Sequence, residues 1–323
     1  MNRKSRQTDD ETEAVRDQGQ GSRGRARRGV SIEIHSIPSV TLADEQFLTG
    51  VTEGKSVLVA GELRFPQPSV ERSPVVVLLH GSSGITLRVE RWAQELNDIG
   101  VATLAVDSFS GRGIRDTIAD QSQLGRLAMI VDAYRALELL SRHRRVDPRR
   151  IALMGFSRGG HATLYASLKR FQSMHAPAAA EFAAYIPVYA ACNTRYIRDD
   201  EVAERPIRLF HGTADDYVQI APSRAYVRRL REKGADVELT EYEGAHHIFD
   251  DPSLDTKVEL ANALTWRHCE LEEDHPGRIV NAKTGAPFTW NDPCVERGAT
   301  VGYQAHAHTE AVKKVKEFLA NHL

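Results

Sequence analysis

The spacing of hydrophobic residues changes repeatedly along the chain from about residue 31 onwards. Residues 75–79 form a continuous apolar run, as expected of a strand that is buried on both faces. Apolar residues then recur at helical spacing between residues 89 and 99, and a second short apolar run follows at residues 101–106. This alternation of strand-like and helix-like segments is typical of an α/β protein, with a mostly parallel sheet and helices on both faces.

The alternation continues to the end of the chain. Further strands are predicted at residues 151–154, 185–189, 207–210 and 237–242. Helices are predicted at residues 127–137, in one segment that carries Leu164, Leu168 and Phe171, and at residues 223–233 and 309–320. Residues 31–37 and 56–65 are predicted to be antiparallel edge strands. Residues 265–302 have Gly and Pro punctuation and no clear period, which predicts a long ordered excursion with little regular structure.

The first 30 residues differ from the rest, because they are rich in Arg, Asp, Glu, Gln and Gly and contain almost nothing to bury. Such a segment cannot offset its ordering entropy, so residues 1–30 are predicted to be a disordered tail. Its positive charges are not followed by the apolar stretch of a secretory signal, which predicts a cytoplasmic protein unless translation starts elsewhere. Residues 31–323 are predicted to form a single α/β domain.

Composition narrows the classes of function. The chain has 323 residues, of which 41% are hydrophobic and 27% charged, as in an ordinary soluble globular protein. A formal net charge of −2 gives no electrostatic reason to expect binding to nucleic acid or to an anionic membrane. No apolar stretch reaches the roughly 20 residues that a transmembrane helix needs. The expected partner is therefore a small molecule, with no nucleic acid and no membrane.

Three cysteines, Cys192, Cys269 and Cys294, are too few for a disulfide framework and lack the spacing of a zinc site. Cys269 and Cys294 flank the Gly-, Pro- and Asn-rich segment, and a bridge between them would leave Cys192 free. Two reduced thiols would instead suit a cytoplasmic protein, since disulfides persist mainly in oxidising compartments. Both interpretations stay open at this point.

The pattern Gly155-Phe156-Ser157-Arg158-Gly159 directly follows a predicted strand and opens a predicted helix. In this context G-x-S-x-G is typical of a nucleophile elbow, a turn so tight that glycine is needed two residues before and two residues after the serine. The serine oxygen would then lie at the N-terminus of a helix, whose dipole favours developing negative charge. The pattern predicts Ser157 as a nucleophile.

A serine hydroxyl is a poor nucleophile unless a base takes its proton. In folds with a nucleophile elbow, an acid and a histidine follow the serine in chain order, each on a loop after a strand. The strand at residues 207–210 leads into a loop with Asp215 and Asp216, and the strand at residues 237–242 leads into a loop with His246 and His247. Order and context fit an acid–histidine pair, while each loop offers two neighbouring candidates.

Several further motifs surround these positions. They are His80-Gly81, Asp107-Ser108-Phe109, residues 155–160, residues 211–215 and Tyr242-x-Gly-Ala-x-His247-x-Phe249-Asp250. In these motifs the chain resembles the dienelactone hydrolase family over about residues 55–323. The resemblance implies an α/β-hydrolase fold without a large cap domain, acting on small esters or lactones.

The resemblance also selects Asp215 as the acid and His247 as the base, with Asp216 and His246 as the alternatives. The sequence departs from the family in one respect, because the namesake enzymes use a cysteine nucleophile where this chain has Ser157. That departure weakens the expectation of dienelactone itself as the substrate.

Acyl transfer also needs two backbone N–H donors aimed at the developing oxyanion. Arg158 supplies one by position, since it directly follows the nucleophile. The loop at residues 80–84 is expected to supply the other, from Ser82 or, as the alternative, from Ser83.

Other polar residues have less specific signals. Arg112 could bind a substrate carboxylate through two parallel hydrogen bonds, or it could be a solvated loop arginine. His80 and His211 precede glycines at strand ends and are expected to be structural. His306 and His308 do not share a helix face, so no metal site is predicted there.

Together these features predict a carboxylic ester hydrolase that works through an acyl-enzyme, with Ser157, His247 and Asp215 as catalytic residues and no cofactor. A serine peptidase similar to prolyl oligopeptidases is the alternative enzyme, but residues 1–54 are far too short for the propeller domain that those usually carry. A non-catalytic binding protein on this fold would normally have lost one of the three residues. The motifs do not specify the oligomeric state or which ester is cleaved.

Overall fold

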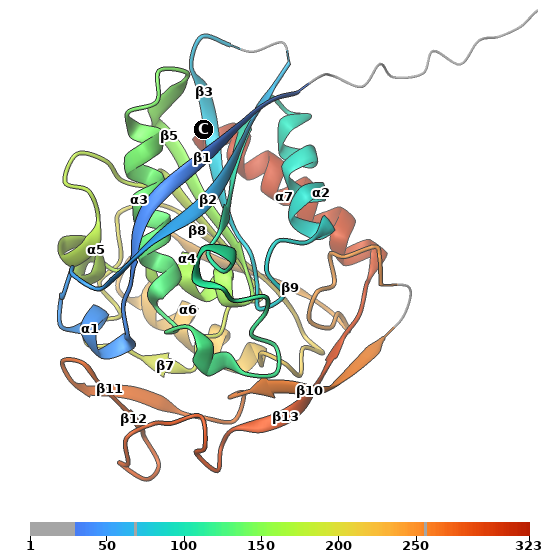
Figure 1. Ribbon diagram of the computed structural model, residues 1–323. Helices are drawn as coiled ribbons and strands as arrows, with labels where there is room; N and C mark the ends of the chain where they lie inside the picture. Colours follow the sequence, from blue (N-terminus) through green and yellow to red (C-terminus); the bar gives the residue numbers. More distant parts are fainter. Residues whose placement is uncertain (1–29, 68–69, 255–256) are drawn as a thin grey trace, which may run out of the picture.

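A computed structural model describes residues 30–67, 70–254 and 257–323. At its centre lies an eight-stranded sheet with the order β1-β2-β4-β3-β5-β6-β8-β9 (Figure 1). Its strands are β1 (Val30–Thr41), β2 (Lys55–Pro66), β3 (Ser73–Leu79), β4 (Ala102–Asp107), β5 (Val146–Phe156), β6 (Ala184–Val188), β8 (Ile207–Gly212) and β9 (Val237–Tyr242). Apart from Val30, the tail predicted at residues 1–30 lies outside the described residues, and the division into a tail and one domain stays a prediction.

The pattern of burial in the strands follows their place in the sheet. β3 is central and parallel to both of its neighbours, and all of its residues are buried because helices cover both faces. β2 pairs antiparallel with β1 and with β4, and its inner residues alternate with more exposed ones. The sheet is therefore mostly parallel, as predicted. Of the two strands predicted at an edge, β1 lies at the edge and β2 lies one strand further in.

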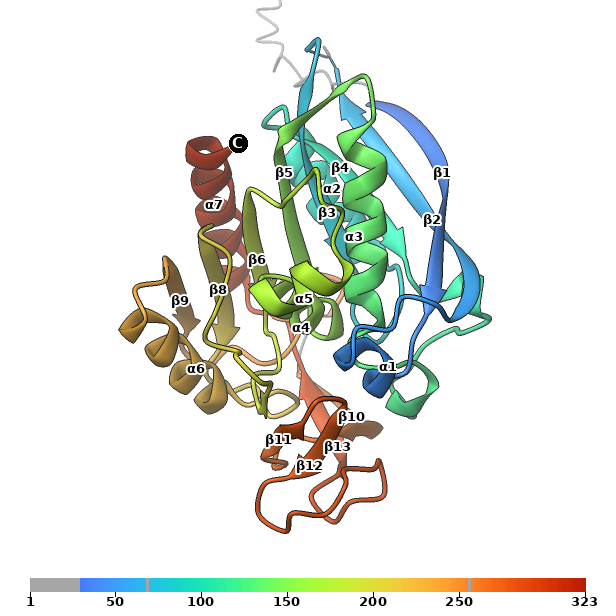
Figure 2. The ribbon, with the colours of Figure 1, turned by 90° about the vertical axis from the view of Figure 1, so that its left-hand side faces the viewer.

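Helices cover both faces of the sheet (Figure 2). They are α1 (Asp44–Leu48), α2 (Leu87–Asn97), α3 (Ala128–Ser141), α4 (Arg158–Tyr165), α5 (Lys169–His175), α6 (Ile220–Glu232) and α7 (Ala305–His322), with single 3-10 turns at Ser110–Arg112 and Gln121–Gln123. α2 and α7 pack with Val76 and Leu78 on one face. α3, α4 and α6 pack with Val75 and Val77 on the other.

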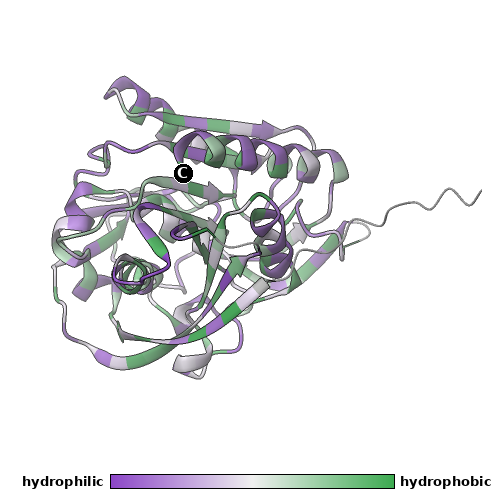
Figure 3. Ribbon diagram, turned by 90° about the horizontal axis from the view of Figure 1, so that it is seen from above, coloured by the Kyte–Doolittle hydropathy of each residue, from purple (hydrophilic) through white to green (hydrophobic). Residues whose placement is uncertain are grey.

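The hydropathy of the elements matches this layered arrangement. Figure 3 shows hydrophobic residues along the central strands and a mixture of hydrophobic and hydrophilic residues along the helices. The helices α2, α6 and α7 thus bury one stripe against the sheet and leave the other in water, whereas every residue of α4 is buried. None of the helices in the described part of the chain has the length and the apolar character that crossing a membrane requires.

The single helix predicted to carry Leu164, Leu168 and Phe171 is two helices, α4 and α5, so that prediction was wrong. The chain leaves the helical conformation at Leu168, whose backbone is extended. Leu168 forms an antiparallel bridge with Val202. Beside it, the Lys169 N–H donates to the backbone oxygen of Glu201 at 2.9 Å, and the Ser167 backbone oxygen accepts the N–H of Ala203 at 2.7 Å. Pairing with a segment that is distant in sequence therefore overrides the local helical pattern.

The prediction of little regular structure in residues 265–302 was also wrong. β10 (Val258–Thr265) pairs antiparallel with β13 (Glu296–Val301), while β11 (Leu271–His275) lies between β12 (Arg278–Asn281) and the short β7 (Thr194–Arg195). Figure 2 shows these two small sheets beyond one end of the central strands. Within the described residues these two are the only sheets besides the central one.

A buried ion pair anchors the small sheets to the central fold. The guanidinium of Arg170 on α5 contacts both carboxylate oxygens of Glu273 on β11, at 2.5 and 2.8 Å. Both side chains are buried, and Arg170 also donates to the backbone oxygen of Leu48 at 2.6 Å. A two-point pair of this kind fixes the direction as well as the distance between its partners.

Cys269 and Cys294 are joined by a disulfide, and Cys192 is a free, buried cysteine. The bridge ties the segment before β11 to the segment before β13. The sequence left open whether these two cysteines are bridged or reduced, and in the structure they are bridged.

Reduction of this disulfide is expected to destabilise the protein. The bridge closes a loop with a sequence separation of 25, for which the chain-entropy model gives about 3.5 kcal/mol of stabilisation. The melting temperature of the Cys269→Ser variant should therefore fall by several degrees. Thiol counting on denatured, unreduced wild type should find one free thiol, from Cys192, and three free thiols in protein purified under air would contradict the bridge.

Candidate active site

Ser157 lies in the turn between β5 and α4, in a conformation that a non-glycine residue rarely adopts (φ 54°, ψ −111°). The turn has no room for side chains on either side of it. A Cβ on Gly155 would lie 2.2 Å from the backbone oxygen of Gly159, and a Cβ on Gly159 would lie 2.3 Å from that of Leu79. The Ser157 N–H donates to the backbone oxygen of Val188 at 3.0 Å, which holds the turn between β3 and β6.

His247 lies on the loop after β9, and its backbone is bound to the end of β13. Its backbone oxygen accepts the N–H of Gly302 at 3.0 Å, and the residue forms a parallel bridge with Val301. Its Nε2 lies 2.9 Å from Ser157 Oγ, and its Nδ1 lies 2.7 Å from Asp215 Oδ2. The structure therefore brings the three predicted residues together in one continuous chain of hydrogen bonds.

Asp215 is fixed on its other side by backbone donors. Its Oδ1 accepts the N–H groups of Tyr217 at 3.0 Å and Val218 at 2.8 Å, and its Oδ2 also lies 3.3 Å from Nε2 of His211. Burial by itself would raise the pKa of Asp215, but the charges and hydrogen bonds of His247 and His211 outweigh burial and hold the pKa below its ordinary value. The carboxylate is thus ionised at neutral pH.

The neighbouring candidates Asp216 and His246 do not belong to this chain of hydrogen bonds. The Asp216 carboxylate accepts the N–H of Thr300 at 2.7 Å and its hydroxyl at 2.8 Å, so it binds β13. His246 Nδ1 is buried and has no hydrogen-bond partner among the described residues. The geometry places Asp215 and His247, rather than these neighbours, in reach of Ser157.

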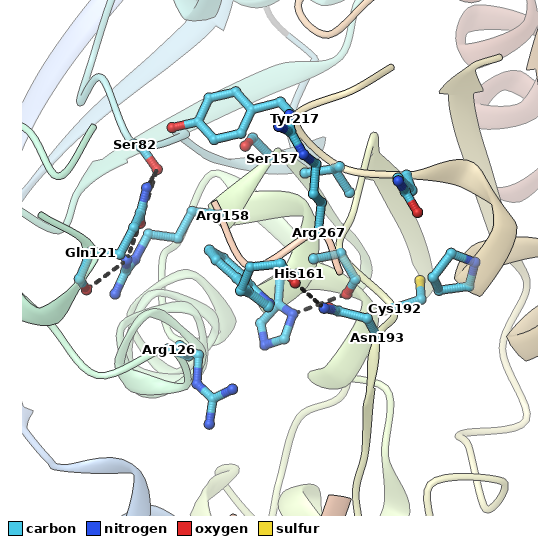
Figure 4. Close-up of a pocket in the computed structure, with 15 residues that line it drawn as sticks. Ser82, Gln121, Arg126, Ser157, Arg158, His161, Cys192, Asn193, Tyr217 and Arg267 are labelled. Carbon is cyan, nitrogen blue, oxygen red and sulfur yellow. Dashed lines mark hydrogen bonds between the residues drawn. The ribbon is translucent and has the colours of Figure 1, made fainter. Parts of the chain in front are cut away.

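Ser157 is one of the residues that line a pocket (Figure 4). The pocket is surrounded by loops at the carboxyl ends of the strands and by the segment after β10. The residues that line it are Ser82, Gln121, Arg126, Ser157, Arg158, His161, Ala191, Cys192, Asn193, Tyr217, Val218, Gln219, Pro222, Trp266 and Arg267. The two residues predicted to supply oxyanion donors, Ser82 and Arg158, are both among them, and Ser83 is not.

The backbone N–H groups of Ser82 and Arg158 are available to a bound oxygen. Arg158 is the first residue of α4, where an N–H has no acceptor within the helix. The N–H of Ser82 has no acceptor in the described ranges of the chain. The Ser82 loop is itself held in place, because the Ser82 backbone oxygen accepts the N–H of Thr117 at 2.8 Å and Gln121 Nε2 donates to Ser82 Oγ at 3.0 Å.

Arg112, one candidate for binding a substrate carboxylate, does not line this pocket. Its guanidinium forms a two-point pair with the buried carboxylate of Asp132, at 2.8 and 2.9 Å, and Nε donates to Thr41 Oγ1 at 2.8 Å. The side chain is buried, so the alternative of a solvated loop arginine was wrong as well. An internal carboxylate occupies the donors that a substrate would need.

The sequence did not single out Arg126, Tyr217, Trp266 or Arg267, although all four line the pocket. Trp266 and Arg267 belong to the segment whose pattern predicted no elements, and Arg126 lies in an ordinary loop before α3. None of them belongs to a motif, so only the folded chain reveals their position.

His80 and His161, which lie outside the chain of hydrogen bonds, are buried and bind backbone groups. His80 is buried, with Nδ1 donating to the Gly81 backbone oxygen at 2.7 Å and Nε2 accepting the Ser108 N–H at 3.1 Å, and burial lowers its pKa. A structural role was predicted for it. Burial likewise lowers the pKa of His161, to about 4. Both rings are therefore neutral at neutral pH.

One group of potential metal ligands lies away from the pocket. Glu33, His35 and His143 have ligand atoms within 4.8 Å of one another. His143 Nε2 lies 2.9 Å from the Glu33 carboxylate, while its Nδ1 accepts the Arg145 N–H at 3.2 Å and the Arg145 guanidinium pairs with Glu33 at 2.9 Å. The guanidinium of Arg145 already neutralises the Glu33 carboxylate, so these residues form an ion-pair network.

Comparison with known proteins places this geometry in context. A solved structure from Klebsiella pneumoniae subsp. pneumoniae MGH 78578, assigned as a dienelactone hydrolase, is 14% identical with a TM-score of 0.59, and 90% of this chain and 99% of that chain are covered. A dienelactone hydrolase-like promiscuous phosphotriesterase from metagenomic libraries is 17% identical with a TM-score of 0.56 and the same coverage. At these identities the likeness concerns the fold.

The sequence itself matches the profile of the Dienelactone hydrolase family over residues 60–270, more than half of the chain. The matched part contains Ser157, Asp215 and His247, and it ends before β11. Family, fold and strand order agree that the protein is a hydrolase with the α/β-hydrolase fold. The chain belongs to the dienelactone hydrolase family.

Proposed function

We propose that the protein hydrolyses carboxylic esters or lactones of small substrates through an acyl-enzyme on Ser157. The observation that carries the proposal is the continuous chain of hydrogen bonds from Asp215 through His247 to Ser157, at the wall of a pocket. The family match supports hydrolysis of the ester or lactone type.

The proton movements follow from the hydrogen bonds of His247. Because the Asp215 carboxylate can only accept, His247 Nδ1 carries a hydrogen and Nε2 of the neutral ring is free to accept the Ser157 proton. Ser157 Oγ then bonds to the substrate carbonyl carbon while Nε2 takes the proton. The carbon–oxygen bond of the ester breaks, and the leaving alkoxide takes that proton as an alcohol. Water, activated by the same Nε2, releases the acid.

Negative charge develops on the carbonyl oxygen in both halves of this reaction. The backbone N–H groups of Arg158 and Ser82 are proposed to receive it, because both residues line the pocket beside Ser157. The N-terminus of α4 adds the favourable end of a helix dipole at the same place. No cofactor is needed for these steps.

Aromatic rings restrict the orientation of the base. The ring of Tyr189 lies 4.6 Å and that of Tyr217 5.0 Å from the His247 ring, measured between centroids. Tyr189 is held in turn, because its hydroxyl donates to the buried carboxylate of Asp250 at 2.9 Å. The imidazole is therefore fixed by packing as well as by Asp215, which keeps Nε2 aimed at Ser157.

Replacing the nucleophile should abolish turnover without unfolding the protein. Ser157→Ala is expected to lower kcat by about 10⁶, as for other triad nucleophiles. A fluorophosphonate probe should label wild type and leave the variant unlabelled. Labelling that survives the substitution would show that another residue is the nucleophile.

The two loops with neighbouring candidates provide matched controls. His247→Ala should lower kcat nearly as much as Ser157→Ala, and Asp215→Asn should lower it by about 10⁴, because the imidazole loses its orientation. His246→Ala and Asp216→Asn change the adjacent positions outside the chain of hydrogen bonds and should cost far less. Steady-state kinetics with p-nitrophenyl esters measures all four, and a reversal within either pair would contradict the assignment.

The lowered pKa of Asp215 predicts a pH dependence of stability. A carboxyl group whose pKa is lower in the folded state stabilises the protein above its ordinary pKa of about 3.9, and this contribution is lost as the pH falls through the folded value. The free-energy difference of unfolding between wild type and Asp215→Asn should therefore shift against wild type as the pH falls below about 4. Urea unfolding at pH 7, 5 and 3 measures it, and a difference independent of pH would argue against an ionised Asp215.

A further inference from the structure

Two backbone turns that non-glycine residues rarely adopt lie beside the imidazole of His247. Tyr189, whose ring centroid lies 4.6 Å from that of His247, has a φ of 38°, and Ile248, the residue after His247, has a φ of 61°. Such a conformation is unfavourable for a bulky or β-branched residue and persists only where the surroundings determine it. The contacts that hold these two turns are therefore candidates for contacts that position the base.

Backbone hydrogen bonds hold each turn separately. The N–H of Tyr189 donates to the backbone oxygen of Phe210 at 2.7 Å, which ties the first turn to β8. The backbone oxygen of Phe249, in the second turn, accepts the N–H of Gln304 at 3.0 Å, which ties that turn to the segment before α7. Neither of these bonds joins one turn to the other.

The carboxylate of Asp250 joins the two turns. Its Oδ1 accepts the hydroxyl of Tyr189 at 2.9 Å, and its Oδ2 accepts the Nε1–H of Trp92 on α2 at 2.7 Å. Asp250 is buried. Both partners donate, so the side chain between them must offer two acceptor oxygens, and the amide of an asparagine would turn an N–H group toward one of the donors. Asp250 thus connects the ring of Tyr189, the turn after His247 and helix α2.

Arg88 supplies a positive charge to the same buried cluster. It lies on α2, and its Cζ lies 5.3 Å from the ring centroid of Phe156 and 5.9 Å from that of Tyr189. Its Nε has no hydrogen-bond partner among the described residues. Burial by itself would lower the pKa of Arg88. Tyr189 and the carboxylates of Asp250 and Asp251 outweigh burial and raise this pKa, so Asp250 offsets the charge of Arg88.

We propose that Asp250 is a positioning residue for catalysis, which holds the ring of Tyr189 against His247 and thereby keeps Nε2 aimed at Ser157. The inference rests on the proposed function for the reaction itself, but the contacts of Asp250 are present without a substrate. Asp250 binds Tyr189 and Trp92 rather than the reacting atoms, so it acts through the ring that packs on the base. Its charge also offsets that of Arg88 and so favours the protonated form of His247.

Steady-state kinetics with p-nitrophenyl butyrate tests the positioning. Asp250→Asn should lower kcat by about 10- to 100-fold and change KM little, because the base is misaligned while the pocket that binds the ester is unchanged. Tyr189→Phe keeps the ring and both charges and removes only the hydrogen bond, so kcat should fall in the same direction but less.

Asp251→Asn is the matched control. It removes the adjacent carboxylate, which binds Arg91 at 2.8 Å and Ser253 at 2.6 Å instead of Tyr189. Its kcat should stay within about twofold of wild type, because an exposed ion pair contributes little. Equal losses in Asp250→Asn and Asp251→Asn, or a loss in Asp250→Asn that falls entirely on KM, would overturn the positioning role.

The pH profile of kcat/KM distinguishes positioning from a loss of packing. Asp250→Asn removes a negative charge and leaves Arg88 without its counter-charge, so protonated His247 becomes less stable. The acid limb of the profile should then move to lower pH by roughly half a unit or more. Arg88→Gln removes the positive charge and should move the same limb to higher pH. A purely structural defect gives no reason for opposite shifts, and unchanged limbs in both variants would contradict the proposal.

Other titratable or charged groups surround His247 and stay in place in these variants, so the difference from wild type reports Asp250 or Arg88 alone. They come from the loop after β8, from α4, from α2, from the loop after β9 and from α7. These groups are Asp215 with His211, Asp216, Tyr217, Arg158, Arg91 with Asp251, His246 and, against Trp92, His308.

A measurement without turnover separates this inference from the proposed function. In the Ser157→Ala protein, nuclear magnetic resonance of labelled histidines gives the pKa of His247, whose signal is assigned by its loss in His247→Gln. Asp250→Asn should lower this pKa and Arg88→Gln should raise it, by the shifts seen in the kinetic profile.

The outcomes are distinguishable. If wild type cleaves no ester but the two substitutions still shift the pKa of His247 in opposite directions, the proposed function fails and the coupling of Asp250 to the base stands. Ester cleavage with an undiminished kcat in Asp250→Asn and an unshifted pKa of His247 would overturn the inference. Tyr189→Phe and Arg88→Gln test the same contacts if the melting temperature shows that Asp250→Asn does not fold.

Discussion

Ser157 holds a left-handed backbone conformation in a space with no room for a side chain on Gly155 or Gly159. The strain is kept because the surrounding backbone determines the turn from two directions, through the close approach of β3 and the hydrogen bond to the end of β6. The same contact places the loop after β3 beside the nucleophile and starts α4 at Arg158. The packing of β3, β5 and β6 around this turn therefore determines three features of the site. It places the N–H groups of Ser82 and Arg158, it sets where the helix dipole of α4 begins, and it orients the Ser157 hydroxyl.

Much of this could be predicted from the sequence, because parallel strands bring their carboxyl ends to one edge. Once the strands before Ser157, Asp215 and His247 are recognised from their apolar runs, their loops must converge. The choice between neighbours could not be derived in that way. Asp215 faces His247 because its other oxygen binds the N–H groups of the turn that follows it, whereas Asp216 binds Thr300 on a strand far along the chain.

Two of the errors in the sequence analysis, those at β11 and Arg112, have a common physical origin in buried polar residues. β11 does not read as a strand because one of its inward positions is Glu273, which is stable there only through its pair with Arg170. Arg112 resembled a ligand-binding residue because the partner that satisfies it, Asp132, belongs to the next helix. In each case the hydrophobic pattern is broken by a charge whose partner only the tertiary structure supplies.

The small sheets after β9 are part of the candidate active site rather than an appendage. β13 holds the backbone of His247 and the side chain of Asp216, and the segment after β10 contributes Trp266 and Arg267 to the pocket. The disulfide and the Arg170–Glu273 pair then fix these sheets to each other and to the core. Differences in this segment would change the pocket wall while leaving the hydrogen-bond chain at Ser157 in place, which is how one fold serves different substrates.

The central claim is that an acyl group is transferred to Ser157. Its most direct test is rapid-quench mass spectrometry of the intact protein and its peptides during turnover of a p-nitrophenyl ester. The account predicts one acyl group per chain, on the peptide that contains Ser157, formed in step with a burst of p-nitrophenol. Turnover without any acylated peptide, or acylation at another residue such as Cys192, would contradict it.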